Sequence, residues 1–222
     1  MNIIGMAISF IYFYIVLLSA YKMGKQLEYS RKFAHIMIGN WYFIAIFLFD
    51  KLTYASVVPL IFVGYGIYSI YKKKDNFVTG LLRKHNQSAI GIIIFPISLV
   101  IILSLSFLYF GSFIPGGIGI AALTYGDSMA ALIGIKFPIL PFKIGKRTKT
   151  LSGCLAMLFF SVVAIYVYKL FLGDYLPFNF PFKFCILLGI VAFLVEIITI
   201  FGLDNLTIPL AVFMTYVLLV NT

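Results

Sequence analysis

The chain has 222 residues, of which 63% are hydrophobic and only 11% are charged, and its mean hydropathy is +1.08. A water-soluble domain of this length needs more polar surface, so the composition excludes that class and indicates an integral membrane protein. The formal net charge of +10 is better explained by loops on one side of a bilayer than by nucleic-acid binding, so we expect no nucleic-acid partner.

The apolar segments, taken in chain order, predict about eight membrane-spanning helices, because a spanning helix needs about 20 largely apolar residues. We expect them at residues 3–21, 33–49, 52–71, 89–110, 114–135, 153–172, 184–201 and 206–220. The first segment has no basic stretch before it and no good cleavage site after it, so we expect a retained helix. The predicted fold is thus an all-α, polytopic integral membrane protein in which residues 1–222 form one domain.

The basic residues are concentrated in alternate connections between these helices. Segments 22–32, 72–88 and 136–152 hold 14 of the 17 Lys and Arg residues. If eight helices alternate in direction, these three segments lie on one side of the membrane, which the positive-inside rule assigns to the cytoplasm. Both termini are then expected on the opposite side.

Ionisable side chains at membrane depth carry the main functional signal, because each is costly there. Asp127 lies toward the end of the fifth predicted helix, and Glu196 lies at a similar depth in the seventh. Asp204 and Asn205 follow at the turn after the seventh helix, and His35 lies one turn into the second. The alternating topology puts all five in one layer at the cytoplasmic side, where we expect the active site.

Each of these residues also has a purely structural interpretation. Asp127 could pair with a cation, Glu196 could hydrogen-bond a neighbouring helix, and His35 could donate to a backbone carbonyl. Arg31 and Lys32 could be ordinary anchors at the membrane surface. Three acids and a histidine at one depth nevertheless favour a shared site.

A ridge of small residues runs beside Asp127. Gly126, Ala130 and Gly134 recur at every fourth position, a spacing that lets another helix approach closely. We expect this packing to hold Asp127 rigidly, as a metal ligand or a base requires.

The acids of the cytoplasmic layer and the cations of the connection after the fifth predicted helix are the residue types that phosphate chemistry needs. The segment IGKRTKTLSG contains Lys146, Arg147 and Lys149. Carboxylates bind Mg²⁺ through oxygen, while Lys and Arg neutralise phosphate oxygens. Phosphoryl transfer depends mainly on positioning and charge stabilisation, so this set suffices without an elaborate nucleophile. The chain contains neither a GxxxxGK[ST] phosphate loop nor an HExxH zinc motif.

Four motifs resemble, in the same order, those of the CTP-dependent lipid kinases, the superfamily of dolichol kinase, phytol kinase and yeast-type diacylglycerol kinase. They are SRKFAHIMIG, TYGDSMAALIGIKF, KRTKTLSG and EIITIFGLDNLTIPL. The resemblance runs from about residue 30 to residue 209, and the phytol kinase-like branch is closest in size. It implies an enzyme that uses CTP, with Mg²⁺, to phosphorylate the primary hydroxyl of a membrane lipid alcohol.

The resemblance also implies roles for the residues that match its motifs. Asp127 would bind the Mg²⁺–nucleotide complex or act as a base, and Asp204 would be a second metal ligand. His35 and Glu196 would be further catalytic residues. The residues expected to bind the nucleotide and its phosphates are Arg31, Lys32, Lys146, Arg147, Lys149, Thr150 and Asn205. Many relatives have an acidic residue where this chain has Ser152, so we assign no metal role to that position.

Two other functions are also compatible with the sequence. A CTP:lipid-phosphate cytidylyltransferase would use a similar set of acids and a similar basic loop but would release pyrophosphate. A small ion-coupled transporter would also need intramembrane acids, although such proteins often have inverted repeats with a site near the midplane, and no repeat is visible here. Candidate acceptors for a kinase are phytol, geranylgeraniol, polyprenol, dolichol and diacylglycerol.

Overall fold

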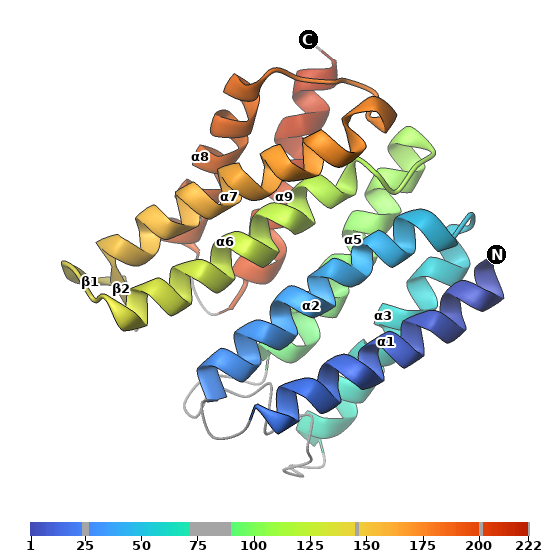
Figure 1. Cartoon of the computed structure of the whole chain (residues 1–222), viewed down its shortest axis with the longest axis horizontal. Helices are drawn as coiled ribbons and strands as arrows, with labels where there is room; N and C mark the ends of the chain where they lie inside the picture. Colours follow the sequence, from blue (N-terminus) through green and yellow to red (C-terminus); the bar gives the residue numbers. More distant parts are fainter. Residues whose placement is uncertain (24–26, 72–89, 145–146, 200–201, 222) are drawn as a thin grey trace.

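The computed structural model describes residues 1–23, 27–71, 90–144, 147–199 and 202–221. Over these ranges the chain forms a bundle of eight α-helices with a short β-hairpin at one end (Figure 1). The α-helices are α1 (Asn2–Lys22), α2 (Leu27–Leu48), α3 (Leu52–Tyr71), α5 (Ile90–Phe110), α6 (Gly116–Lys136), α7 (Leu151–Leu172), α8 (Phe182–Ile198) and α9 (Asp204–Val220). The predicted all-α class is confirmed, with one helix in each predicted segment.

Four segments within the described residues are long and apolar enough to cross a membrane. They are α1, Ile93–Phe110 of α5, α6, and Leu151–Tyr175, which combines α7 with the 3₁₀ helix η1 (Gly173–Tyr175). Shorter apolar helices lie at Leu52–Tyr68 and in α9. These four spans indicate an integral membrane protein.

The buried core lies mainly in two adjoining clusters. One cluster gathers side chains of α6, α7, α8 and α9 around Met157 and Leu188, both fully buried. The other gathers α1, α2, α3 and α5 around Trp41 and Leu103. The Trp41 indole donates to Ser9 Oγ at 2.8 Å, so this polar N–H is satisfied within an apolar environment.

Helix α2 begins earlier than the sequence predicts. It starts at Leu27 rather than at residue 33, so Arg31 and Lys32 belong to the helix and not to the preceding connection. His35 is consequently two turns into the helix instead of one. The charged residues do not end the helix because each has a partner: Glu28 pairs with Arg31 three residues along, and Lys32 pairs with Asp127 of α6.

The connection between α6 and α7, expected to be a loop, contains a β-hairpin. Strand β1 (Pro141–Ile144) pairs antiparallel with β2 (Arg147–Thr150), and Phe142 lies opposite Lys149. Thr150 ends the hairpin and caps the next helix, since its side chain accepts a hydrogen bond from the Gly153 backbone N–H at 3.1 Å. The hairpin therefore leads directly into α7 and fixes the position of Lys149 beside the helix ends.

The ridge of small residues on α6 packs against α7, as predicted. A Cβ atom added at Gly126 would overlap Ser161 Oγ and approach Met157 Sδ, and one added at Gly134 would lie 3.4 Å from the Gly153 Cα. Ser161 Oγ also donates to the Ala122 carbonyl at 3.1 Å. The two helices thus approach each other closely at these glycines, which fixes the position of α6 and of Asp127.

This close packing predicts that Gly126→Ala destabilises the protein by about 1–3 kcal/mol through overpacking, although alanine is the better helix former. Gly64 in α3 is the matched control, because a Cβ atom there meets nothing within 4 Å. Gly64→Ala should be neutral or stabilise by up to about 1 kcal/mol. Thermal unfolding of both variants in the same detergent measures the difference, and equal midpoints would refute the packing argument.

Candidate functional site

A buried ion pair joins α2 to α6. Lys32 Nζ lies 2.5 Å from Asp127 Oδ2 and also donates to the Asp127 backbone carbonyl at 3.2 Å. Lys32 is only 2% exposed, so its charge is stabilised almost entirely by this carboxylate. Asp127 therefore does pair with a cation, as its structural interpretation expected. The ion pair joins two motifs whose paired residues lie 95 residues apart in the chain.

His35 lies beside the same carboxylate. Its Nε2 atom is 3.6 Å from Asp127 Oδ2, too far for a hydrogen bond, and its ring stacks on Phe95 with the ring centroids 4.3 Å apart. Within the described part of the chain, Nε2 has no hydrogen-bond partner although it is buried. The imidazole is thus held in place by stacking and leaves one nitrogen available next to Asp127.

A second ion pair joins the hairpin to α8. Lys149 Nζ lies 2.9 Å from Glu196 Oε1 and also donates to the Glu196 backbone carbonyl. The other carboxylate oxygen, Glu196 Oε2, is buried and has no partner among the residues described. Burying a carboxylate oxygen without a donor is costly, so this atom is a candidate ligand for a cation or an acceptor for a bound group.

Three carboxylates from three helices meet between these ion pairs. One oxygen each from Asp127, Glu196 and Asp204 can be chosen so that all lie within 4.8 Å of one another. Glu196 lies near the end of α8, which ends at Ile198, and Asp204 is the first residue of α9. The short connection between the two helices keeps these carboxylates close together. Mg²⁺ binds oxygen at 2.0–2.1 Å, so ligands on opposite sides of the ion lie about 4.2 Å apart. The three acids are therefore close enough together to be candidate ligands of one divalent cation.

The structure brings the three predicted acids and His35 together, with Lys32 and Lys149 beside them. The other predicted phosphate ligands have different surroundings. Arg31 forms two hydrogen bonds with Glu28, at 2.5 and 3.2 Å, although Asp127 and Asp204 also act on its charge. Thr150 caps α7. The Asn205 backbone N–H donates to Asp204 Oδ1 at 3.0 Å. Lys146 lies outside the described residues, and Arg147 is described only as part of β2.

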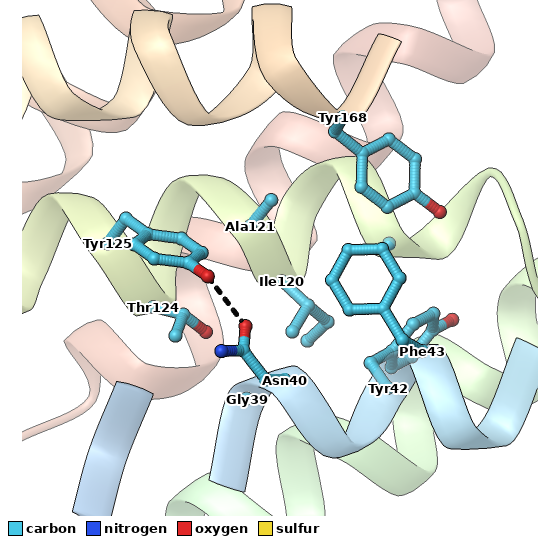
Figure 2. Close-up of a pocket in the computed structure, with 10 residues that line it drawn as sticks. Gly39, Asn40, Tyr42, Phe43, Ile120, Ala121, Thr124, Tyr125 and Tyr168 are labelled. Carbon is cyan, nitrogen blue, oxygen red and sulfur yellow. Dashed lines mark hydrogen bonds between the residues drawn. The ribbon is translucent and has the colours of Figure 1, made fainter. Parts of the chain in front are cut away.

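A small pocket that sequence patterns did not indicate lies between α2 and α6, beside residues that precede Asp127 along α6. The free space inside it is about enough for one water molecule. Asn40, Thr124 and Tyr125 line one end, and Figure 2 shows the Tyr125 hydroxyl directed at the Asn40 side chain. The sequence does place the polar residues Asn40 and Thr124 within apolar helices. Such residues are common at helix contacts in membrane proteins, so they do not by themselves indicate a pocket.

Comparisons with protein-family models, with curated proteins and with solved structures found no match to this chain. The functional interpretation therefore depends on the residues themselves and on their arrangement.

Proposed function

We propose that this protein is a CTP-dependent kinase of membrane lipid alcohols, related to the superfamily that its motifs resemble. It would transfer the γ-phosphoryl group of CTP to a primary hydroxyl and produce a lipid monophosphate and CDP. The observation that supports this most strongly is the convergence of Asp127, Glu196 and Asp204 with two lysines and a histidine. These side chains come from four separate motifs of the sequence.

The two lysines provide the positive charge that a triphosphate needs. Lys32 neutralises Asp127, and Lys149 neutralises Glu196. When CTP binds, we expect each ammonium group to turn from its carboxylate to a phosphate oxygen, which carries more charge. Arg31, the residue before Lys32 on α2, would add to this field.

The three carboxylates fit the Mg²⁺ that accompanies a nucleoside triphosphate. Asp127, Glu196 and Asp204 would hold it, and Glu196 Oε2, buried and without a partner among the described residues, supports this assignment. Bound Mg²⁺ would neutralise charge on the phosphate oxygens. Removing divalent cations with a chelator should accordingly abolish transfer.

In the proposed reaction Asp127 orients the acceptor hydroxyl and accepts its proton, while His35 supports the carboxylate from 3.6 Å away. The lipid oxygen forms a bond to the γ-phosphorus. The bond between that phosphorus and the oxygen bridging to the β-phosphate breaks, and CDP leaves with the electron pair. Lys32 and Lys149 stabilise the charge on the transferred group and on CDP.

We also infer that all eight helices span the membrane and that the site faces the cytoplasm. The ends of α1, α3 and α6 and the starts of α2, α5 and α7 lie toward the end of the bundle that carries the hairpin (Figure 1). The connections at this end hold most of the basic residues. The positive-inside rule then gives this end access to cytoplasmic CTP.

The hairpin offers a matched test of the nucleotide site. Lys149→Met should raise the KM for CTP by about tenfold or more, because a charge-assisted hydrogen bond to phosphate is lost. Lys143→Met is the control, since Lys143 lies on the paired strand with its side chain exposed. Steady-state kinetics with varied CTP measure both. Equal KM values for the two variants would remove Lys149 from the nucleotide site.

The function itself is tested with the purified protein, Mg²⁺, CTP labelled in the γ-phosphate and a panel of lipid alcohols. The panel contains phytol, geranylgeraniol, a polyprenol, dolichol and diacylglycerol. We expect label in the phosphate ester of at least one lipid. A folded protein that labels none of them, and that binds no CTP in a direct binding assay, would contradict the proposal.

A further inference from the structure

Seven consecutive exposed residues lead from the end of α6 into the β-hairpin. Every side chain from Ile135 to Pro141 is exposed, and Lys136 is the only charged residue among them. Ile139 and Leu140 expose 60% and 67% of their surface. A contiguous apolar surface of this kind marks a contact with a partner or with a membrane. Residues 135–141 therefore form a candidate contact surface.

The backbone of Leu140 supports a contact outside the chain. Its φ of 45° lies in the left-handed region, where glycine or asparagine is the ordinary residue, and no other non-glycine residue described in the structure has a positive φ. Such a conformation costs free energy, and a side chain that is mostly exposed recovers little of it within the bundle. A leucine at this position is accounted for if its side chain is covered by something else.

The exposed segment continues the lipid-facing side of α7. The Leu151 backbone N–H, at the start of α7, donates to the carbonyls of Ile139 and Leu140 at 3.0 and 3.3 Å. Leu151, Leu155 and Phe159 are all exposed and share one helix face, because they recur at every fourth position. Since α7 belongs to a candidate membrane span, lipid covers this face. Ile139 and Leu140 extend the face past the end of the helix.

Most backbone polar groups of the segment are bonded within the chain, as an environment with little water requires. The Phe137 carbonyl accepts hydrogen bonds from the Ile139 backbone N–H at 2.8 Å and from Ser152 Oγ. Pro138 and Pro141 have no N–H group to satisfy. The two carbonyls bonded to the start of α7 complete this pattern. The segment can therefore lie at the edge of the hydrocarbon at little cost in hydrogen bonds to water.

Two exposed lysines flank the apolar side chains. Lys136 ends α6, and Lys143 lies on the exposed side of β1, whose side chains alternate between exposed and half-buried. Lys149 lies opposite Phe142, on the other side of the hairpin, and pairs with Glu196. Lys143 is thus directed away from the proposed phosphate site. Lysines that border an apolar surface place their ammonium groups at the level of lipid headgroups.

We propose that residues 135–143 form an interfacial surface that binds anionic phospholipids. Ile139 and Leu140 enter the outer part of the acyl region beside the start of α7, and Lys136 and Lys143 contact headgroup phosphates. The hairpin lies at the end of the bundle to which the positive-inside rule gives the cytoplasmic side, where the leaflet is rich in anionic lipids (Figure 1). This inference does not depend on the kinase function, because the surface faces away from Glu196.

Local quenching by lipids tests the surface. The full chain with Leu140→Cys, labelled with an environment-sensitive fluorophore, is reconstituted in phosphatidylcholine vesicles. Spin-labelled phosphatidylcholine or spin-labelled phosphatidylglycerol, with the spin label at the same acyl position, is added at the same low mole fraction. Both should quench, and phosphatidylglycerol should be about threefold to tenfold more effective, because one lysine near the surface favours an anionic headgroup by roughly fivefold.

Three controls accompany this measurement. Adding Lys136→Gln and Lys143→Gln to the labelled protein should remove the preference for phosphatidylglycerol, while phosphatidylcholine still quenches. Phe159→Cys is the matched lipid-facing position, two turns into α7, and should show no preference between the two lipids. The native cysteines described in the structure are buried, and the unsubstituted protein treated in the same way measures any labelling of them. If Leu140→Cys lowers the melting temperature, Ile139→Cys takes its place.

Three results would overturn the proposal. Quenching of the Leu140→Cys label by aqueous iodide, but by neither lipid, would place the segment in water. Equal quenching by the two lipids would show that the lysines select no anionic headgroup. A label shielded from both lipids and from iodide would mean that a second copy or another part of the chain covers the segment. The kinase assay is unaffected by any of these results, so the two proposals fail separately.

Discussion

Asp127→Asn is expected to lower the rate of lipid phosphorylation by about a hundredfold to ten-thousandfold, the range associated with removal of a general base. An asparagine has nearly the same shape, but it accepts no proton and is a weaker ligand for a hard cation. The site would then lack its proton acceptor and one of the three carboxylates that meet between α6, α8 and α9. The measurement is the turnover number with saturating CTP and lipid.

The control for this variant must separate chemistry from folding, because Asp127 also neutralises the buried Lys32. The double variant Asp127→Asn/Lys32→Met removes both charges and should fold better than Asp127→Asn alone while remaining inactive. Asp174→Asn changes an exposed acid in η1, next to the other end of α7, and should retain full activity. Full activity of a folded Asp127→Asn protein would rule out Asp127 as base and metal ligand.

Lys32→Met is expected to have the largest effect on stability. Lys32 is 2% exposed and its ammonium lies 2.5 Å from the Asp127 carboxylate, so the substitution leaves a half-buried negative charge without its main partner. Breaking one side of a buried ion pair costs about 3–5 kcal/mol. The unfolding free energy of the single variant should therefore fall by about that amount in detergent, whereas Lys51→Met, at an exposed lysine, should have little effect.

A double-mutant cycle isolates the interaction between the two residues. If the pair is the cause, Lys32→Met and Asp127→Asn together should destabilise the protein by less than the sum of the single variants. The difference should exceed about 1 kcal/mol, because the atoms are in direct contact. Strict additivity would mean that the ion pair contributes nothing to the stability of the contact between α2 and α6.

Hydropathy was sufficient to predict the eight helices, because each contains close to 20 mostly apolar residues between polar connections. It could not predict where α2 begins. Arg31 and Lys32 look like loop residues until their partners are known, and the partner of Lys32 lies 95 residues away. The hairpin was also missed, since a run of four residues such as RTKT carries too little pattern to be recognised as a strand.

The sequence predicted that Asp127, Glu196 and Asp204 would share a layer, because their depths in alternating helices can be counted. The pairing of Lys32 with Asp127 and of Lys149 with Glu196 depends on how each helix is rotated about its axis, which hydropathy does not determine. The pocket lay beyond prediction for the same reason. It lies beside the contact at which Gly39 lets α2 approach Thr124 so closely that an added Cβ would overlap the threonine side chain.

The central claim is tested most directly by following the α- and γ-phosphates of CTP separately. The purified protein is given Mg²⁺ and CTP labelled at one phosphate or the other, with a lipid alcohol or its monophosphate as acceptor. We expect that the γ-label enters the lipid alcohol, that the α-label remains in CDP, and that Asp127→Asn lowers the formation of both products by about a hundredfold or more. Transfer of the α-label to the lipid monophosphate with release of pyrophosphate would contradict it and identify a cytidylyltransferase instead.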